Sequence, residues 1–195
     1  MRVTQSIVVL ASGIAFSAVA TAADTGSEVQ RNINQQQRIE QGLQSGQLNT
    51  KEAAKLEREE SRVDKMESNA LKDGKLTPAE QARINREQNK VSQDIYREKH
   101  DAQTGNPNSA SSQRMQADVQ RNINQQKRVE QGVQSGQLTN REAGKLERGQ
   151  ARVTRTEARA GADGHVGARE QRNIQRRENN QSRKIYKEKH DEARN

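Results

Sequence analysis

The sequence predicts an all-α protein made of two tandem three-helix units, and three observations support this prediction. Residues 29–101 recur at residues 119–191, at a constant offset of 90 and without insertion, with 41 identities among 73 aligned positions. The few aliphatic residues of each copy fall at helical spacing. Turn and cap residues separate the helical stretches at matching places. We therefore divide the chain into repeat 1 (29–101), a flexible linker (102–118) and repeat 2 (119–191).

The first two helices of repeat 1 follow from their apolar stripes and from the turns that end them. The first is expected over about residues 29–43, with Ile33 and Ile39 facing inward, and it ends at the Gln-Ser-Gly turn 44–46. The second is expected over residues 50–70 and ends at Asp73-Gly74. Its inward stripe has spacings of three, four or seven and consists of Ala53, Leu56, Val63, Met66 and Ala70.

The third helix has the clearest start signal in the chain. Thr77-Pro78-Ala79-Glu80 is a capping box with proline at the first helical position. The helix then carries Ile84, Val91 and Ile95 inward and is expected to end near His100. The following segment is rich in Ser, Asn, Gly and Gln, a composition typical of a linker.

Repeat 2 follows the same plan, but it loses apolar groups and one cap. Met66, Leu71, Val91 and Thr77-Pro78 are replaced by Thr156, Gly161, Gln181 and Gly167-Ala168. A lost cap costs about 1 kcal/mol, so we expect repeat 2 to be less stable, with a frayed third helix. Charge changes as well: repeat 1 has 14 Lys and Arg against 13 Asp and Glu (+1), whereas repeat 2 has 17 against 9 (+8).

The first 23 residues read as a secretory signal peptide. Arg2 precedes an apolar run over residues 7–20, and small residues follow it, so cleavage is expected after Ala22 or Ala23. The protein is then periplasmic or secreted, with no transmembrane segment after the signal is removed. The chain has no Cys and therefore no disulfide. Only 22 Leu, Ile and Val occur in the 172 residues from Asp24 onward, which excludes a large apolar core.

Four turns share the pattern Gly-x-aliphatic-x-x-x-Glu, which resembles the second half of an EF-hand calcium loop. They run over residues 46–52, 74–80, 136–142 and 164–170. The departures are large, because none of the four offers an acidic residue at the first or third ligand position. The resemblance implies at most a weak calcium site, and the best candidate ligands are Asn69, Asp73, Thr77 and Glu80.

Helix capping accounts for the same glutamates without a metal. Each lies three residues after Asn49, Thr77, Thr139 or Gly167, so in three of the four turns it completes a capping box. The glycine then supplies a left-handed end to the preceding helix. We favour capping over metal binding for these turns.

A second candidate site is the C-terminal end of each repeat. Residues 96–101 and 186–191 place Tyr and His four positions apart with carboxylates nearby, which could hold a transition metal. One His with one or two carboxylates is an incomplete ligand set. A solvated helix end, with His beside the negative end of the helix dipole, is the favoured interpretation.

We expect no enzymatic activity. The chain has no cysteine nucleophile, no G-x-S-x-G, no HExxH and no phosphate-binding glycine loop. Carboxylates are expected to pair along helix surfaces, as Glu52 with Lys55, Glu59 with Arg62 and Glu87 with Lys90. Export and the scarcity of aromatic residues argue against cytoplasmic nucleic acid as a partner.

The excess positive charge of repeat 2 suggests binding to acidic partners such as anionic lipid, lipopolysaccharide, other envelope polymers or acidic proteins. A solvated charged helix is the alternative interpretation. The contact residues we expect are Arg148, Arg152, Arg155, Arg159, Arg172, Arg176, Arg177 and Arg183.

The two segments RxxNQQQRIxxGxxSGxLTxxEAxxLExxxxR and ADGxLTxxExxRxxxxQNxxSxxIYxxKHD resemble a group of uncharacterised exported proteobacterial proteins. The corresponding stretches are 31–62 and 72–101, and again 121–152 and 162–191. The resemblance implies export and helical repeats, but no activity. The preferred hypothesis is a non-enzymatic binding or structural protein of the cell envelope. Metal-ion binding through the EF-hand-like loops, and a chain that folds only on meeting a partner, are the alternatives.

Overall fold

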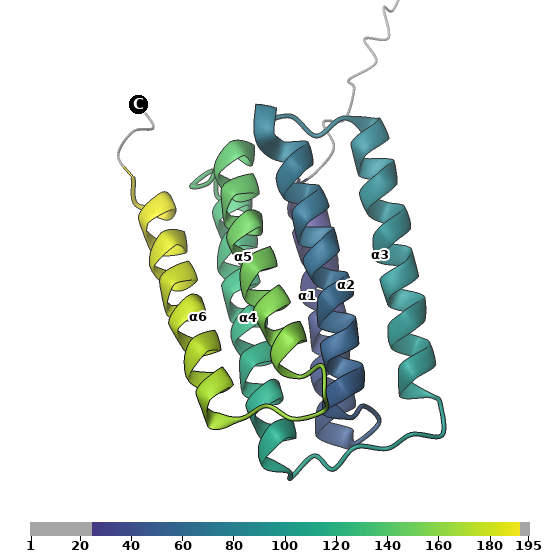
Figure 1. Cartoon of the computed structure of the whole chain (residues 1–195). Helices are drawn as coiled ribbons and strands as arrows, with labels where there is room; N and C mark the ends of the chain where they lie inside the picture. The colour runs from purple at the N-terminus through teal and green to yellow at the C-terminus, as the bar shows by residue number, and fades with distance from the viewer. Residues whose placement is uncertain (1–24, 192–195) are drawn as a thin grey trace, which may run out of the picture.

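All regular structure in residues 25–191, the part of the chain that the computed structural model describes, is helical (Figure 1). Repeat 1 forms α1 (Thr25–Ser45), α2 (Thr50–Ala70), the 3-10 turn η1 (Leu71–Asp73) and α3 (Pro78–Lys99). Repeat 2 forms α4 (Ala110–Gln134), α5 (Asn140–Ala160) and α6 (Ala168–Lys189). No strand occurs in these residues, so the predicted all-α class is confirmed. The predicted signal peptide lies outside the described residues.

Most helix boundaries agree with the sequence prediction. The bounds of α2 are those predicted, and α3 begins and ends where its capping box and His100 indicated. The first helix starts four residues earlier than expected, at Thr25. The fraying expected for the last helix is not present, because α6 is continuous over 22 residues, the same length as α3. The relative stability of the two repeats stays a prediction.

The turns between helices use the predicted residues. Gly46, Gly74, Gly136 and Gly164 all have positive φ, between 71° and 89°, a backbone conformation that favours glycine. Three of the four following helices begin with a complete capping box. At α2, for example, the Glu52 amide donates to Asn49 Oδ1 (3.0 Å) and the Asn49 amide donates to Glu52 Oε2 (2.9 Å).

The two repeats pack against each other rather than standing apart. Helices α2 and α5 lie side by side, as do α1 and α4, while α3 and α6 occupy the two outer flanks (Figure 1). The α2–α5 contact is antiparallel, because the start of α5 meets the end of α2. Asn140 Nδ2 donates to the Gly74 carbonyl (3.2 Å) and Arg148 Nε donates to Ser68 Oγ (3.3 Å), while Ser61 Oγ, in the middle of α2, donates to the Ala151 carbonyl (3.1 Å). The centre is therefore a four-helix bundle to which each repeat contributes two helices.

The predicted flexible linker, residues 102–118, is wrong in two respects. Helix α4 begins at Ala110, with Ser109 as its cap, so the second half of this segment is helical. The first half is fastened to repeat 1, because the Gly105 amide donates to the Gly46 carbonyl (2.8 Å). A Cβ on Gly105 would lie 2.3 Å from the Leu48 carbonyl oxygen, which shows how closely this connection packs on the α1–α2 turn.

The interior combines a thin aliphatic core with many buried polar groups. Predicted core residues such as Ile33, Ile39 and Ile95 are fully buried. Between them lie Asn and Gln side chains that bridge helices, and repeat 2 repeats several of these bonds. Gln35 Nε2 donates to the Gln88 carbonyl (2.6 Å), and the equivalent Gln125 Nε2 donates to the Glu178 carbonyl (2.9 Å). Polar contacts thus fill much of the space that aliphatic groups occupy in an ordinary bundle.

Candidate functional site

Acidic and basic side chains are separated between the interior and the surface. Of the 24 Asp and Glu at positions 25–191, 13 are buried, 6 are half-buried and 5 are exposed. Of the 32 Lys and Arg in the same range, none is buried and 25 are exposed. The surface is therefore far more positive than the formal net charge of +8 indicates.

Helical spacing explains this separation on α2. Its buried carboxylates, at positions 57, 60, 64 and 67, are three or four residues apart and share the stripe that faces the bundle. The basic residues at 51, 55, 58, 62 and 65 have the same spacing on the opposite side. Among residues 25–191, the predicted pairs Glu52–Lys55, Glu59–Arg62 and Glu87–Lys90 form no ion pair within 4 Å. Glu52 instead caps its own helix, and Arg62 acts on Glu59 only at longer range.

Helices α2 and α5 together present a continuous basic face. Every exposed residue of α5 is basic, and every exposed residue of α2 is basic except Asn69. The basic face, as we call it, has five residues from α2 and six from α5. They are Lys51, Lys55, Arg58, Arg62, Lys65, Arg141, Lys145, Arg148, Arg152, Arg155 and Arg159.

Few of these cations are neutralised. Lys55 Nζ lies 2.6 Å from Glu98 Oε1, and Lys145 Nζ lies 3.7 Å from Glu188 Oε2, so α3 and α6 pair with the two edges of the basic face. Arg148 Nε donates to Ser68 Oγ (3.3 Å), which holds its guanidinium over the α2–α5 contact. Within residues 25–191, the other members of the basic face form no ion pair within 4 Å.

The eight arginines predicted as contact residues are all exposed, but they belong to two surfaces. Arg148, Arg152, Arg155 and Arg159 are four of the six α5 members of the basic face. The other four lie on α6, the outer helix, where exposed Asn, Gln, Tyr and Glu170 separate the cations. They are Arg172, Arg176, Arg177 and Arg183.

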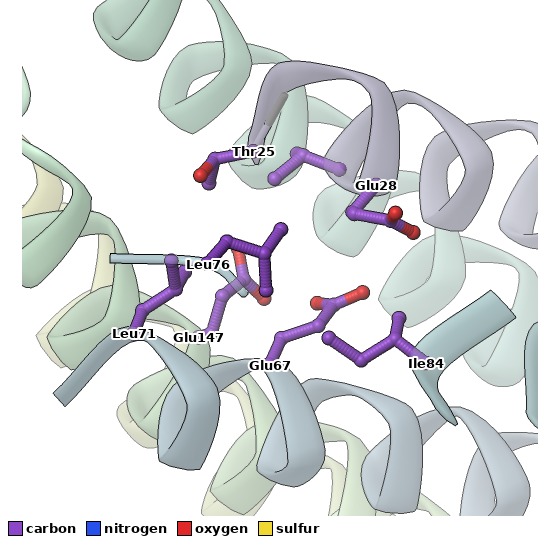
Figure 2. A pocket seen from close by; sticks show the side chains of 8 residues that line it. Thr25, Glu28, Glu67, Leu71, Leu76, Ile84 and Glu147 are labelled. Atoms are coloured by element: carbon purple, nitrogen blue, oxygen red, sulfur yellow. The ribbon is translucent and has the colours of Figure 1, made fainter. Parts of the chain in front are cut away.

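Beneath the basic face, buried carboxylates gather in two places that the repeat relates to each other. The Asp64 cluster consists of Asp64, Glu67 and Glu147, with Glu28 nearby; Figure 2 shows Glu28, Glu67 and Glu147 around a small cavity. The Asp118 cluster consists of Glu57, Asp118, Glu157 and Glu178. Adding 90 converts Glu28 to Asp118 and Glu67 to Glu157, while Glu57 corresponds to Glu147.

Burial dominates the electrostatics of the Asp64 cluster. It raises the pKa of Glu67 to about 8, although hydrogen bonds from Asn32 act in the opposite direction. Burial, followed by the charge of Glu147, raises the pKa of Asp64 well above its usual range. Burial and the charge of Glu67 do the same to the pKa of Glu147. Like charges held together in a poorly solvated interior resist ionisation.

The Asp118 cluster has the same buried character, but it also contacts a cation. Burial raises the pKa of Glu57 to about 8 and that of Asp118 to about 7. Burial and Asp118 raise the pKa of Glu178 to about 8, against the lowering effect of Arg121. Arg121 Nε lies 3.2 Å from Glu178 Oε2.

Three of the four predicted EF-hand-like ligands, Asp73, Thr77 and Glu80, form local hydrogen bonds. Glu80 Oε2 accepts from the Thr77 amide (3.0 Å), and Asp73 Oδ1 accepts from the Lys75 amide (2.9 Å). Asn69 and Glu80 line a shared surface groove, but Arg83 lines it as well. The capping interpretation of the loop glutamates is thus supported by the hydrogen bonds, and calcium binding at these loops stays a prediction.

The Tyr and His side chains at the C-terminal end of each repeat are exposed, and they contact each other and the backbone of their own helix. The Tyr96 and His100 rings stack at 4.1 Å between centroids, and His100 Nδ1 lies 2.6 Å from the Tyr96 carbonyl oxygen. Tyr186 and His190 repeat this arrangement. Near the first of these ends, Asp101 lies within metal-ligand spacing of Glu52 and Glu98, but Lys55 already pairs with Glu98.

No protein-family model, curated protein or solved structure matches this chain. Among the described residues, none of the helices has the length and apolar character needed to cross a membrane.

Sequence reasoning missed the α2 half of the basic face and the buried carboxylates. The near-zero net charge of repeat 1 concealed both, because its acids are mostly inside and its bases outside. One signal was available in the sequence of α2. Glu57, Glu60, Asp64 and Glu67 are spaced by three, four and three residues, a heptad-like pattern that places them on one face of the helix. Carboxylates at such positions are normally assigned to the surface.

Proposed function

We propose that this protein is a non-enzymatic binding protein whose basic face engages anionic polymers or surfaces rich in phosphate or carboxylate. The observation that carries the proposal is the basic face itself: eleven exposed cations on two adjacent helices, among which no acidic residue is exposed. This refines the sequence-based hypothesis, which placed the contact residues in repeat 2 alone.

The shape of the basic face favours an extended partner over a small anion. Lys51 and Lys65 are fourteen residues apart on α2, which corresponds to about 20 Å of helix. The cations repeat along that length on two antiparallel helices, so they match a row of regularly spaced anionic groups. Arginine, which predominates on α5, can donate two hydrogen bonds to one phosphate or carboxylate.

Peripheral attachment suits this surface better than insertion into a lipid bilayer. The exposed large hydrophobic side chains among the described residues are Tyr96 and Tyr186, on α3 and α6. The basic face itself offers no apolar group to bury in a membrane. Binding should therefore depend on electrostatics and weaken as salt rises.

A charge-neutralised variant tests the proposal. Arg148→Gln, Arg152→Gln and Arg155→Gln together remove three charges from the centre of the basic face, together with the hydrogen bond from Arg148 to the buried Ser68. At about 1 kcal/mol per basic residue near an anionic surface, we expect roughly 100-fold weaker binding to vesicles containing phosphatidylglycerol. Cosedimentation at several NaCl concentrations measures this loss, and heparin replaces the vesicles in a second series to represent a soluble polymer.

The matched control removes the same charge from α6, through Arg172→Gln, Arg176→Gln and Arg177→Gln. We expect the affinity of this control to stay at least tenfold higher than that of the α5 variant. Equal losses in both variants would mean that only net charge matters, and affinity that does not change with salt would contradict the proposal. Circular dichroism of both variants checks that the helices are retained.

A further inference from the structure

The Asp64 cluster lacks the cation that its repeat equivalent has. In the Asp118 cluster, Arg121 pairs with Glu178, but repeat 1 has Gln88 at the position equivalent to Glu178. The equivalent arginine, Arg31, instead donates to Asn85 (3.0 Å) and Asn89 (2.6 Å). Across residues 25–191, no ion pair within 4 Å includes Asp64, Glu67 or Glu147.

Two oxygens of the Asp64 cluster are buried without a hydrogen-bond partner. They are Asp64 Oδ1 and Glu147 Oε2, and each residue is only 1% exposed. Glu67 and Glu147 are among the residues that line a neighbouring cavity of about 10 Å³, together with apolar groups such as Leu76, and Figure 2 shows both side chains beside it. Buried carboxylate oxygens that lack donors are costly unless something compensates them.

The spacing of the three carboxylates suits a metal ion. One oxygen from each of Asp64, Glu67 and Glu147 lies within 4.8 Å of the other two. Two oxygens on opposite sides of a calcium ion are about 4.6 to 5.2 Å apart, because calcium–oxygen bonds measure about 2.3 to 2.6 Å. Carboxylate ligands without nitrogen or sulfur select hard cations such as calcium and manganese.

Neighbouring amides hold one of the three carboxylates in place. Asn32 Nδ2 donates to both oxygens of Glu67 (2.8 and 3.0 Å), and Gln88 Nε2 donates to Glu67 Oε1 (3.2 Å). These bonds orient the Glu67 carboxylate as supporting residues orient the ligands of many metal sites. Asp64 is held more loosely, through one bond from Thr154 to Oδ2.

We propose that Asp64, Glu67 and Glu147 bind one hard divalent cation, of the Ca²⁺ or Mn²⁺ type, inside the four-helix bundle. Two ligands come from α2 of repeat 1 and the third comes from α5 of repeat 2, so the bound ion ties the two repeats together. The ion supplies the positive charge that Arg121 provides in the other cluster. This site is separate from the EF-hand-like loops and from the basic face.

Titration with Mn²⁺ tests the site directly in a chain of residues 24–195. After removal of metals with chelator at pH 7.5, the free Mn²⁺ signal in electron paramagnetic resonance reports binding, and Ca²⁺ serves as the competitor. We expect one Mn²⁺ bound per chain and a melting temperature about 5 to 10 °C higher in 1 mM metal.

Variants distinguish this site from the loops. Glu147→Gln and, separately, Asp64→Thr should each weaken Mn²⁺ binding at least tenfold; threonine is the residue at the equivalent position 154, so the fold accommodates it there. Glu80→Gln, in the EF-hand-like loop, should leave binding unchanged. The proposal is overturned by absence of Mn²⁺ binding at 1 mM, by full binding in Glu147→Gln and Asp64→Thr, or by loss of binding in Glu80→Gln.

Discussion

Each repeat, produced alone, is expected to be largely unfolded. A fragment of residues 24–105 retains α1, α2 and α3 but loses α4 and α5, which cover the inner faces of α1 and α2. Its Glu60, Asp64 and Glu67 side chains would then become solvated, and the aliphatic residues of α1 and α2 would lose their contacts with α4 and α5. A fragment of about 80 to 90 residues with so little apolar area is too marginally stable to tolerate such a loss.

Circular dichroism of residues 24–105, of residues 106–195 and of their equimolar mixture measures this effect. We expect weak helical signal without a cooperative melt from each fragment, and recovery of most of the helix on mixing, because the two repeats complete one bundle. An isolated repeat 1 that melts cooperatively at the temperature of the whole chain would instead support two independent domains.

The whole chain, in chelator, is expected to become markedly less stable as pH rises from 5.5 to 8. Burial raises the pKa of Glu57 and Glu178 to about 8 and that of Asp118 to about 7, from ordinary values of 4.5 and 3.8. At pH values between the unfolded and the folded pKa of each group, the folded state keeps a proton that the unfolded chain has released. Because the folded state binds more protons, its free energy of unfolding falls with rising pH, and this stabilisation is complete only below the unfolded pKa values.

The expected size of this effect is large. One group titrating in this way contributes up to about 1.4 kcal/mol per pH unit, so a few groups lower the melting temperature by at least about 10 °C. Thermal melts at pH 5.5, 7 and 8 measure it. Glu178→Gln, which copies Gln88 of repeat 1, should raise the melting temperature at pH 8 and leave it nearly unchanged at pH 5.5. A melting temperature that rises with pH would refute the assignment.

The sequence was sufficient to predict the helices because their signals are local. Thr77, Pro78 and Glu80 mark the start of α3 whatever surrounds it, and the capping box forms as expected. Gly46 and Gly74 mark helix ends for the same reason, since their positive φ values are a property of the turn. The all-α class and most helix bounds therefore follow from short stretches of sequence.

The packing of the repeats could not be predicted, because it depends on contacts 90 or more residues apart. Ser61 bonds to Ala151 and Asp64 bonds to Thr154, and no local pattern announces either pair. The same holds for the buried carboxylates. A stripe of Glu and Asp is usually solvated, and the packing of both α1 and α5 against α2 places Glu57 and Glu67 inside.

The basic face depends on both features that could not be predicted, the packing of the two repeats and the burial of the α2 carboxylates. The arginines of α5 were predicted from the charge of repeat 2, whereas Lys51, Arg58 and Arg62 of α2 were not. Net charge counts acids and bases equally, but a partner in solution meets only exposed groups. Because the carboxylates of α2 are buried, its exposed Lys and Arg side chains form one surface with those of α5.

In this bundle, most acidic side chains are held inside while the basic side chains cover the surface. Titration of the side-chain carboxyl carbons by ¹³C NMR, in a chain of residues 24–195 with chelator present, tests this separation most directly. We predict a distinct set of carboxyl groups that includes Glu57, Asp118 and Glu178 and that titrates with pKa values of about 7 to 8. If every carboxyl group instead titrated below about pH 5, as solvated Asp and Glu do, the carboxylates would not be buried and the claim would be contradicted.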